Sequence, residues 1–190
     1  MGRIASAALA AAGILLLTPA AKAAVTVLGN GLAHSCFETA EFGGNPAEGI
    51  VVCDQALDQG TLAPHDRAAT QINRGILYSH IDEIDAAIRD YNEGLALDPA
   101  MGEAYVDRGA AYIVLKRYDD ALRDINKGIE LNANRLQIAY YDRAIIEEAL
   151  GNVRAAYEDY KKAVEIEPNF QLANEQLARF KVIRHQNDGT

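Results

Sequence analysis

The chain has 190 residues, of which 49% are hydrophobic, and its formal net charge is −9 at pH 7. This length and this apolar content fit a globular chain with a sizeable core and exclude an intrinsically disordered one. The acidic balance disfavours binding to nucleic acid or to an anionic membrane surface, and it favours solubility and basic partners.

The first 23 residues have the organisation of a secretory signal peptide. A basic start at Arg3 precedes an apolar run over residues 4–17, and the small residues Ala21 and Ala23 close the segment. This order of features predicts export, to the periplasm or outside the cell, with cleavage near Ala23. No cysteine follows the run, so a lipoprotein anchor is not expected.

An alternative interpretation is a retained anchor helix, since residues 4–21 could almost span a bilayer. Cleavage would remove Arg3 and Lys22, which changes the formal net charge from −9 to −11. No later segment is long and apolar enough to be expected to cross a membrane, so no integral membrane segment is expected after removal.

A flexible leader is expected over residues 24–31. Apolar and small residues then recur at helical spacing over residues 32–43 and 46–57, and Gly43, Gly44 and Asn45 interrupt them. This pattern predicts a divergent helical hairpin over residues 32–60, followed by a loop that ends at Pro64.

A repeat unit follows the hairpin. Arginines recur at residues 74, 108 and 143, in steps of 34 and 35, and alanines at residues 87, 121 and 156 keep the same steps. A period of this length is typical of helix-turn-helix arrays. We therefore expect three helix pairs, within residues 66–99, 100–133 and 134–168.

The chain after Pro168 has the pattern of a closing helix. Asn169 can cap it, and Leu172, Leu177 and Phe180 would face inward while charged residues face solvent. We expect this capping helix over residues 169–185 and a disordered tail over residues 186–190.

The residues that recur in the three copies resemble the tetratricopeptide repeat (TPR) family. The first copy supplies Gly75, Tyr78, Ala87, Tyr91 and Pro99; the second Tyr105, Gly109, Tyr112, Ala121 and Ile125; the third Tyr140, Ala144, Ala156, Tyr160, Ala163 and Pro168. The resemblance implies an all-α fold, a right-handed α-solenoid of antiparallel helix pairs with a C-terminal capping helix.

The copies depart from the family pattern where leucine is usual, since each has an arginine there, and an aspartate follows sixteen residues later in every copy. In the divergent hairpin the corresponding residues are Cys36 and Val52, so both charges are lost together. A buried guanidinium needs a carboxylate, and we infer that the two side chains meet across the helices. The predicted structural ion pairs are Arg74 with Asp90, Arg108 with Asp124, and Arg143 with Asp159.

The two cysteines of the chain lie in the divergent hairpin. A shift of 38 residues places Cys36 at the position of Arg74 and Cys53 at the position of Tyr91. In an exported chain these cysteines predict one disulfide that joins the two helices. The alternative is a metal site in which His34 and Cys36 act together with Cys53.

The resemblance also implies that the first helix of each pair lines an inner, concave surface, which could bind a partner segment. Members of the family that bind a C-terminal carboxylate use lysines and asparagines there, and this chain offers only Asn73. A segment with hydrophobic anchors and a positive charge is expected to fit better. The alternative is that these residues are ordinary surface or are partly covered by neighbouring helices. The candidate groove residues are Ile72, Ile76, Glu103, Val106, Asp107, Ala110, Ile113, Ile138, Tyr141, Asp142, Ile145 and Glu148.

The sequence contains no nucleophile elbow, no glycine loop for phosphate and no pair of histidines at metal-binding spacing. Gly75 and Gly109 lie inside expected helices, where close helix approach explains them better than a cofactor does. No catalytic, cofactor or metal site is therefore expected. We expect a monomeric, non-catalytic adaptor of the cell envelope that binds a protein or peptide. The alternatives are a structural subunit that assembles through the array ends or convex face and, from a third class, an enzyme.

Overall fold

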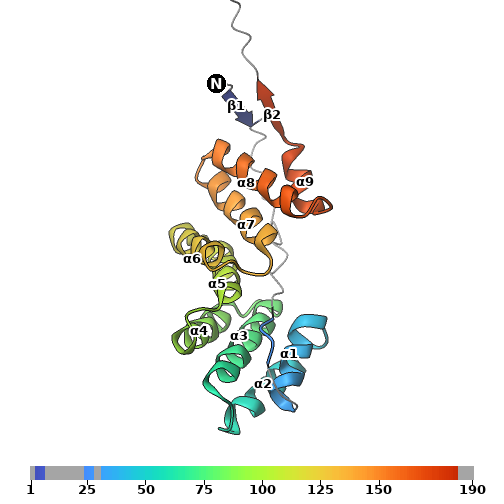
Figure 1. Ribbon diagram of the computed structural model, residues 1–190, viewed down its shortest axis with the longest axis vertical. Helices are drawn as coiled ribbons and strands as arrows, with labels where there is room; N and C mark the ends of the chain where they lie inside the picture. Colours follow the sequence, from blue (N-terminus) through green and yellow to red (C-terminus); the bar gives the residue numbers. More distant parts are fainter. Residues whose placement is uncertain (1–2, 7–23, 28–30, 184–190) are drawn as a thin grey trace, which may run out of the picture. The chain divides into compact units, whose positions relative to one another are not determined.

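The computed structural model describes residues 3–6, 24–27 and 31–183. Most of the predicted signal peptide, residues 28–30 of the leader and the predicted tail lie outside this range. Nine α-helices and two short strands are found among the described residues (Figure 1). Contacts divide the chain into an N-terminal unit, Leu17–Arg135, and a C-terminal unit formed by Leu136–Thr190 with Met1–Leu16.

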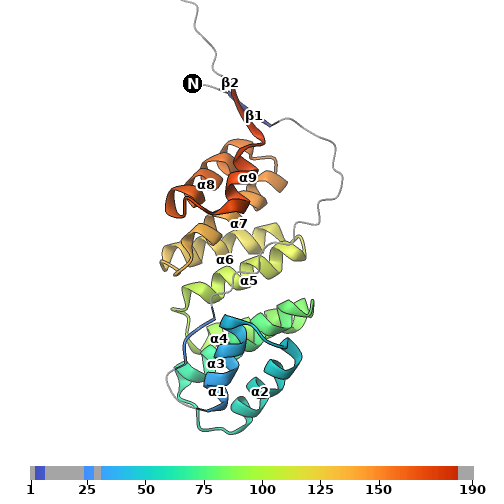
Figure 2. The same ribbon diagram turned by 90° about the vertical axis from the view of Figure 1, so that its right-hand side faces the viewer.

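The N-terminal unit contains three antiparallel helix pairs. Within it, each pair packs against the next through the second helix of one pair and the first helix of its successor (Figure 2). The helices are α1 Leu32–Phe42 and α2 Pro46–Asp58, α3 Pro64–His80 and α4 Ile84–Leu97, and α5 Gly102–Val114 and α6 Tyr118–Glu130.

The C-terminal unit contains the last helix pair, α7 Leu136–Ala149 and α8 Val153–Ile166, and the short helix α9 Gln171–Leu177. The predicted all-α array of antiparallel helix pairs is therefore confirmed. No helix in the described part of the chain is both long and apolar enough to span a membrane.

The expected capping helix over residues 169–185 is wrong in its second half. Helix α9 ends at Leu177, and the strand β2, Phe180–Ile183, pairs antiparallel with β1, Arg3–Ser6. The β-branched residues Val182 and Ile183 favour a strand at this point. The ring of Phe180 packs on α8, with its centroid 5.7 Å from that of Tyr157.

The turn inside each regular repeat has one residue in the left-handed conformation, always at the same place. Its φ is 63° at Asp82, 56° at Lys116 and 81° at Gly151. Such a residue ends a helix and lets the chain reverse into the next one. Only the third repeat has a glycine there, the residue that adopts this conformation without strain.

Small residues allow the two helices of a repeat to approach closely. A methyl group at Gly75 would lie 2.7 Å from Cε1 of Tyr91, and one at Gly109 would lie 2.7 Å from Cδ1 of Ile125. Each glycine therefore makes room for a large side chain from the second helix of its own pair. This contact explains glycine inside helices, where it otherwise costs about 1 kcal/mol.

Candidate functional site

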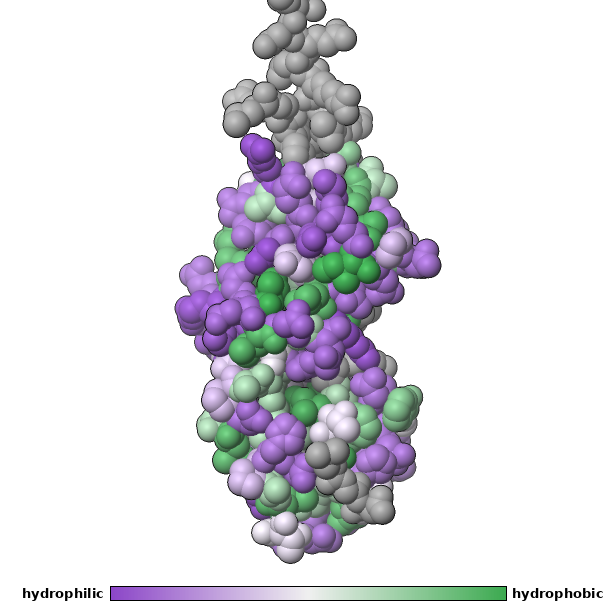
Figure 3. Space-filling view, in the orientation of Figure 1, coloured by the Kyte–Doolittle hydropathy of each residue, from purple (hydrophilic) through white to green (hydrophobic). Residues whose placement is uncertain are grey.

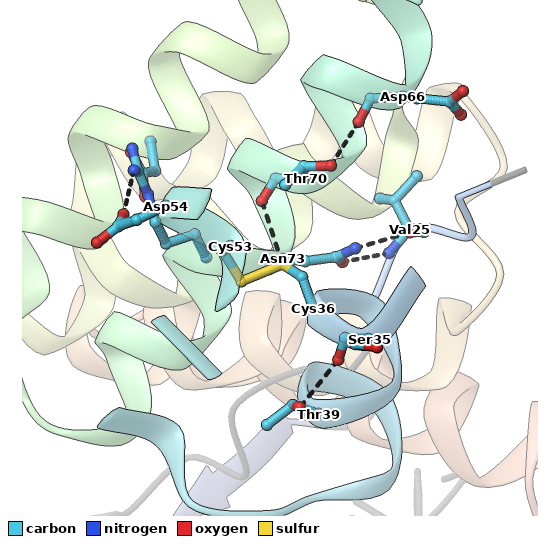
Figure 4. The surroundings of a disulfide bond; sticks show 11 residues. Val25, Ser35, Cys36, Thr39, Cys53, Asp54, Asp66, Thr70 and Asn73 are labelled. Atoms are coloured by element: carbon cyan, nitrogen blue, oxygen red, sulfur yellow. Dashed lines mark hydrogen bonds and ion pairs between the residues drawn. A yellow bond between two sulfur atoms is a disulfide. The ribbon is translucent and has the colours of Figure 1, made fainter. Parts of the chain in front are cut away.

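Cys36 of α1 and Cys53 of α2 form a disulfide (Figure 4). Their Cα atoms are 5.0 Å apart and both residues are fully buried. Cys36 Sγ also lies 3.8 Å from the carbonyl oxygen of Thr70 in α3. The disulfide therefore joins the hairpin internally at a point where the hairpin packs against the first regular repeat. Among the described residues no group of three His, Cys, Asp or Glu side chains could hold a metal ion.

Each regular repeat carries a two-pronged ion pair between its helices. In all three, the arginine donates Nε–H to one carboxylate oxygen of the aspartate and Nη2–H to the other. The N···O distances are 2.7 and 2.7 Å for Arg74 with Asp90, 2.6 and 2.9 Å for Arg108 with Asp124, and 2.7 and 2.8 Å for Arg143 with Asp159.

In the N-terminal unit the remaining nitrogen of the arginine binds the preceding helix pair. Arg74 donates Nη1–H to Asp54 of α2 at 2.6 Å, and Arg108 donates to Asn92 of α4 at 2.7 Å. These partners were not predicted from the sequence. Asp54 and Asn92 are 38 residues apart, the same shift that relates the two pairs, and this spacing is a signal that could have found them.

These arginines remain charged at any physiological pH. The hydrogen bonds that Arg74 and Arg143 donate to Asp90 and Asp159 raise the pKa values of the two arginines above the ordinary range. Burial alone would lower the pKa of Arg108, but the hydrogen bond and the charge of Asp124 outweigh it and raise that pKa as well. A permanently charged guanidinium that pairs with an aspartate in every repeat fits an architectural role, and it does not exchange a proton at physiological pH.

The aromatic residue of the first helix covers the arginine in the second and third repeats. The Cζ atoms of Arg108 and Arg143 lie 5.5 and 5.2 Å from the ring centroids of Tyr105 and Tyr140. These distances allow a cation–π interaction. The first repeat has Gln71 at this position, and its amide donates to Glu93 of α4 instead.

The structure corrects the candidate groove, because eight of its twelve predicted residues are buried. A methyl group at Gly94 would lie 2.6 Å from Cδ1 of Ile72, and Val106 fills the corresponding place against Gly128. These two side chains point to the second helix of their own pair and not to a groove. The buried residues are Ile72, Ile76, Val106, Asp107, Ala110, Tyr141, Asp142 and Ile145.

The other four predicted groove residues, Glu103, Ile113, Ile138 and Glu148, are half-buried. Glu103 accepts a hydrogen bond from the backbone N–H of Asn134 at 2.9 Å. Glu148 accepts one from the Tyr160 hydroxyl at 3.2 Å and also pairs with Arg179. Both carboxylates thus have structural partners, and Ile113 and Ile138 are the predicted groove residues that are apolar and not fully buried.

Two buried aspartates, Asp107 of α5 and Asp142 of α7, occupy equivalent positions in their repeats. Asp142 is fully buried, and its carboxylate oxygens find no hydrogen-bond partner among the described residues. Burial raises its pKa to about 8, so that it is largely protonated at neutral pH. Burial also raises the pKa of Tyr91, and the charge of nearby Asp107 adds to that rise.

The leader is fixed at residues 24–27, which corrects the expectation that it is flexible throughout. Asn73 of α3 accepts a hydrogen bond from the backbone N–H of Val25 at 2.8 Å and donates one to its carbonyl oxygen at 2.9 Å (Figure 4). The backbone N–H of Ala24 donates to Oε2 of Glu41 at 3.2 Å, and Val27 is 4% exposed. The buried Asn73 amide thus binds both polar groups of one residue, as a neighbouring β-strand would.

We call this part of the N-terminal unit the α1–α3 face and define it by Glu41 and Asn73. From the sequence, Asn73 was noted only as the one asparagine of the expected groove. Nothing in the sequence of the leader, Ala24-Val25-Thr26-Val27, indicated that it would lie here, because the contacts with Glu41 and Asn73 join residues far apart in the chain and do not recur with the repeat period. The face therefore binds an extended stretch of polypeptide in the folded protein.

The rest of the described surface is mixed in character. In the view of Figure 3 hydrophilic residues cover most of the C-terminal helices, and apolar residues occur in small groups. A shallow, open hollow at the turn between α7 and α8 is lined by Glu147, Asn152 and Arg154. The most exposed large apolar side chains of the described part are Phe42, 76% exposed, and Val51, 52% exposed, both in the first hairpin.

Helix pairs of this length, joined by a turn geometry that recurs from repeat to repeat and packed through glycine and alanine, define a class of helical repeat modules. The sequence matches the tetratricopeptide repeat family at residues 68–101, 102–135 and 138–170, which together make up more than half of the chain. The chain belongs to this family. No curated protein sequence matches the chain.

Solved structures of the same fold include two with bound peptides. The first TPR of Spaghetti (RPAP3) bound to the HSP90 peptide SRMEEVD is 30% identical, with a TM-score of 0.56 over 59% of this chain and 88% of that one. The second TPR domain of human RPAP3 in complex with the HSP70 peptide SGPTIEEVD is 26% identical, with a TM-score of 0.57 over 62% and 97%. MamA, at 22% identity and a TM-score of 0.64 over 79% and 82%, shares the fold.

Proposed function

We propose that the protein is an exported, non-catalytic adaptor of the cell envelope that holds a segment of a partner protein on the inner helices of its array. The observation that carries this proposal is the extended segment at residues 24–27, which the α1–α3 face binds through its backbone. The two peptide-bound relatives support the same use of the fold.

The partner segment is expected to be basic and partly apolar. The carboxylates Glu41 of α1 and Glu103 of α5 are half-buried, and the half-buried Ile113 of α5 offers apolar surface. The formal net charge of the exported chain, −11 after loss of two basic residues, would attract a positive segment over a long range. The peptides of the two relatives end in Glu-Glu-Val-Asp, and such acidic ends would be repelled here.

A binding assay with matched variants tests this proposal. A labelled peptide with leucine anchors and lysines should bind the mature chain, weaken with added salt, and bind better than an acidic peptide of equal length. Ile113→Arg should weaken binding at least tenfold, because it removes an apolar anchor and adds a like charge. Val114→Arg is the matched control, since Val114 is the adjacent residue, is 49% exposed and lies on another side of α5. Equal affinity for both peptides, or equal loss in both variants, would contradict the proposal.

The cellular location needs its own measurement. Fractionation should recover the protein in the periplasm or medium with a new N-terminus near Ala24, whereas a retained anchor would leave residues 1–23 in place. Cleavage would also remove β1, the partner of β2. Recovery of the uncleaved chain in the cytoplasm would contradict the envelope role and leave the binding result standing.

A structural subunit is the second candidate, and the exposed Phe42 and Val51 of the first hairpin favour it. Size-exclusion chromatography with light scattering separates the two functions. The adaptor should elute with the mass of one chain at all concentrations, and a subunit should form larger species that Phe42→Ser disrupts.

A further inference from the structure

The N-terminal unit places a carboxylate opposite the backbone nitrogen of Ala24. Oε2 of Glu41 lies 3.2 Å from this nitrogen, and Oε1 of Glu41 lies 3.0 Å from Nη2 of Arg135. The two carboxylate oxygens therefore have different partners. One partner is a permanent cation, and the other is the nitrogen of the residue that follows the predicted cleavage point.

We propose that Glu41 and Asn73 form a binding site for the α-amino terminus that export creates, and that the occupant is the segment Ala24–Val27 of the chain itself. This inference rests on the export part of the proposed function. Hydrolysis of the Ala23–Ala24 amide by water leaves a carboxylate on Ala23 and an amine on Ala24, which takes up a proton. The backbone N–H of Ala24, whose hydrogen bond Glu41 accepts, then becomes part of an ammonium group.

Cleavage would strengthen the contact between the Ala24 nitrogen and Glu41. A hydrogen bond from a neutral amide to a carboxylate becomes a charge-assisted pair, which is roughly twice as strong. Glu41 is suited to this pairing because its side chain is 23% exposed, so water screens the pair less than at an open surface. Asn73 holds the next residue by two hydrogen bonds and thereby fixes the distance between the amine and Glu41.

The charges that act on the amine include those of Glu41 and of Arg135, which pairs with Glu41. Glu41 of α1 attracts it, and Arg135, which follows α6 and shares Glu41, repels it; Asn73 of α3 contributes an uncharged amide. Attraction at hydrogen-bond distance should exceed repulsion from the farther guanidinium. The pKa of the Ala24 amine should therefore lie above the ordinary 7.7 to 8.0 by about half a unit to one unit.

The linkage fixes the direction of the pH effect. The unfolded amine titrates near its ordinary pKa and the folded amine above it, so the stabilisation is complete below about pH 7.5 and is lost as the pH rises through the folded pKa. Glu41→Gln should remove this pH dependence. Arg135→Gln should enlarge it, because the competing cation is absent.

The experiment uses the exported chain, after N-terminal sequencing has identified its first residue. NMR titration of isotopically labelled Ala24 should give a raised pKa in the wild type, an ordinary one in Glu41→Gln, and an unchanged, raised one in Glu38→Gln. Glu38 is the matched control because it lies on α1 and its side chain is 55% exposed. In a chain that begins one residue earlier, the α-amine lies on Ala23 and is displaced from Glu41 while the site is unaltered. That amine should have an ordinary pKa.

An Ala24 amine with an ordinary pKa in the wild type, or a first residue other than Ala24, would overturn the inference. So would a raised pKa that survives Glu41→Gln. The peptide-binding assay on the same samples keeps the two proposals apart. Peptide binding with an ordinary amine pKa refutes only the amino-terminus site, and a raised pKa without peptide binding refutes only the adaptor.

Discussion

The first hairpin and the regular repeats fasten their helices at the same place with different chemistry. Helix α1 has Cys36 where α3 has Arg74, and the shift of 38 residues that relates them also relates Asp54 to Asn92. In the repeats the guanidinium satisfies one aspartate in its own pair and, in the N-terminal unit, one polar residue of the preceding pair. In the hairpin a disulfide joins the two helices directly.

The difference follows from the neighbours that each pair has. No helix pair precedes α1 among the described residues, so an arginine at residue 36 would have no acceptor for its third nitrogen. An unsatisfied buried charge is costly. A disulfide needs no preceding neighbour, and it restricts the unfolded chain as well. The terminal pair of a repeat array, which packs on one side only, gains most from such a bond.

Breaking the disulfide should have the largest effect on stability. Its sequence separation is 17 residues, and a loop of this size is worth about 3 kcal/mol in chain entropy. Urea unfolding of the oxidised and reduced mature chain measures the difference. A Cys36→Ala, Cys53→Ala variant should unfold like the reduced form and be insensitive to reductant. Identical midpoints for oxidised and reduced wild type would contradict the comparison.

Removing one partner of an ion pair should come next. Asp124→Ala leaves Arg108, whose side chain is 17% exposed, with the hydrogen bond to Asn92 and the ring of Tyr105 but without its carboxylate partner. We expect a loss of about 2 to 3 kcal/mol, less than for a fully buried charge because some water reaches the guanidinium. Asp120→Ala on the same helix removes only surface pairs with Arg117 and Arg123, and it should unfold within error of the wild type. Equal effects of the two substitutions would refute the role of the pair.

Asp142 should make the stability of the third repeat depend on pH. The equivalent residue of the first repeat is Asn73, which does not titrate. With a folded pKa of about 8 and an unfolded pKa near 3.9, folding takes up a proton between these values. Stability should therefore fall as the pH rises from 5 to 8, by about 1 to 3 kcal/mol. Asp142→Asn should remove this slope in thermal melts at pH 5, 6.5 and 8. A slope that persists in the variant would exclude Asp142 as its source.

The smallest effect is expected at the turn inside the second repeat. Lys116 has φ 56°, which strains a side chain with a Cβ atom, and Lys116→Gly should raise stability by about 0.5 to 1 kcal/mol. The opposite exchange in the third repeat, Gly151→Ala, should lower stability by a similar amount. Chemical unfolding measures the change in the free energy of unfolding in each variant. Changes of the same sign in both variants would show that turn strain does not decide stability here.

Features that recur with the period could be predicted from the sequence, and single contacts could not. The Arg–Asp spacing of sixteen and the shared shift of the two cysteines predicted side chains that the structure brings together. The groove was misplaced because neighbours of Arg74 in sequence, such as Ile72, need not share its helix face. The hydrogen bonds between Val25 and Asn73 join residues 48 positions apart and occur once, so no repeated pattern in the sequence could predict them.

The central claim is that the α1–α3 face binds polypeptide, with residues 24–27 in the place that a partner segment would take. The most direct measurement compares the affinity of the basic peptide for the mature chain and for a chain that begins at Thr26. Because the shortened chain keeps the buried Val27 but lacks the residues held by Glu41 and Asn73, it should bind the peptide about three- to tenfold more tightly. An unchanged or weaker affinity would contradict the claim.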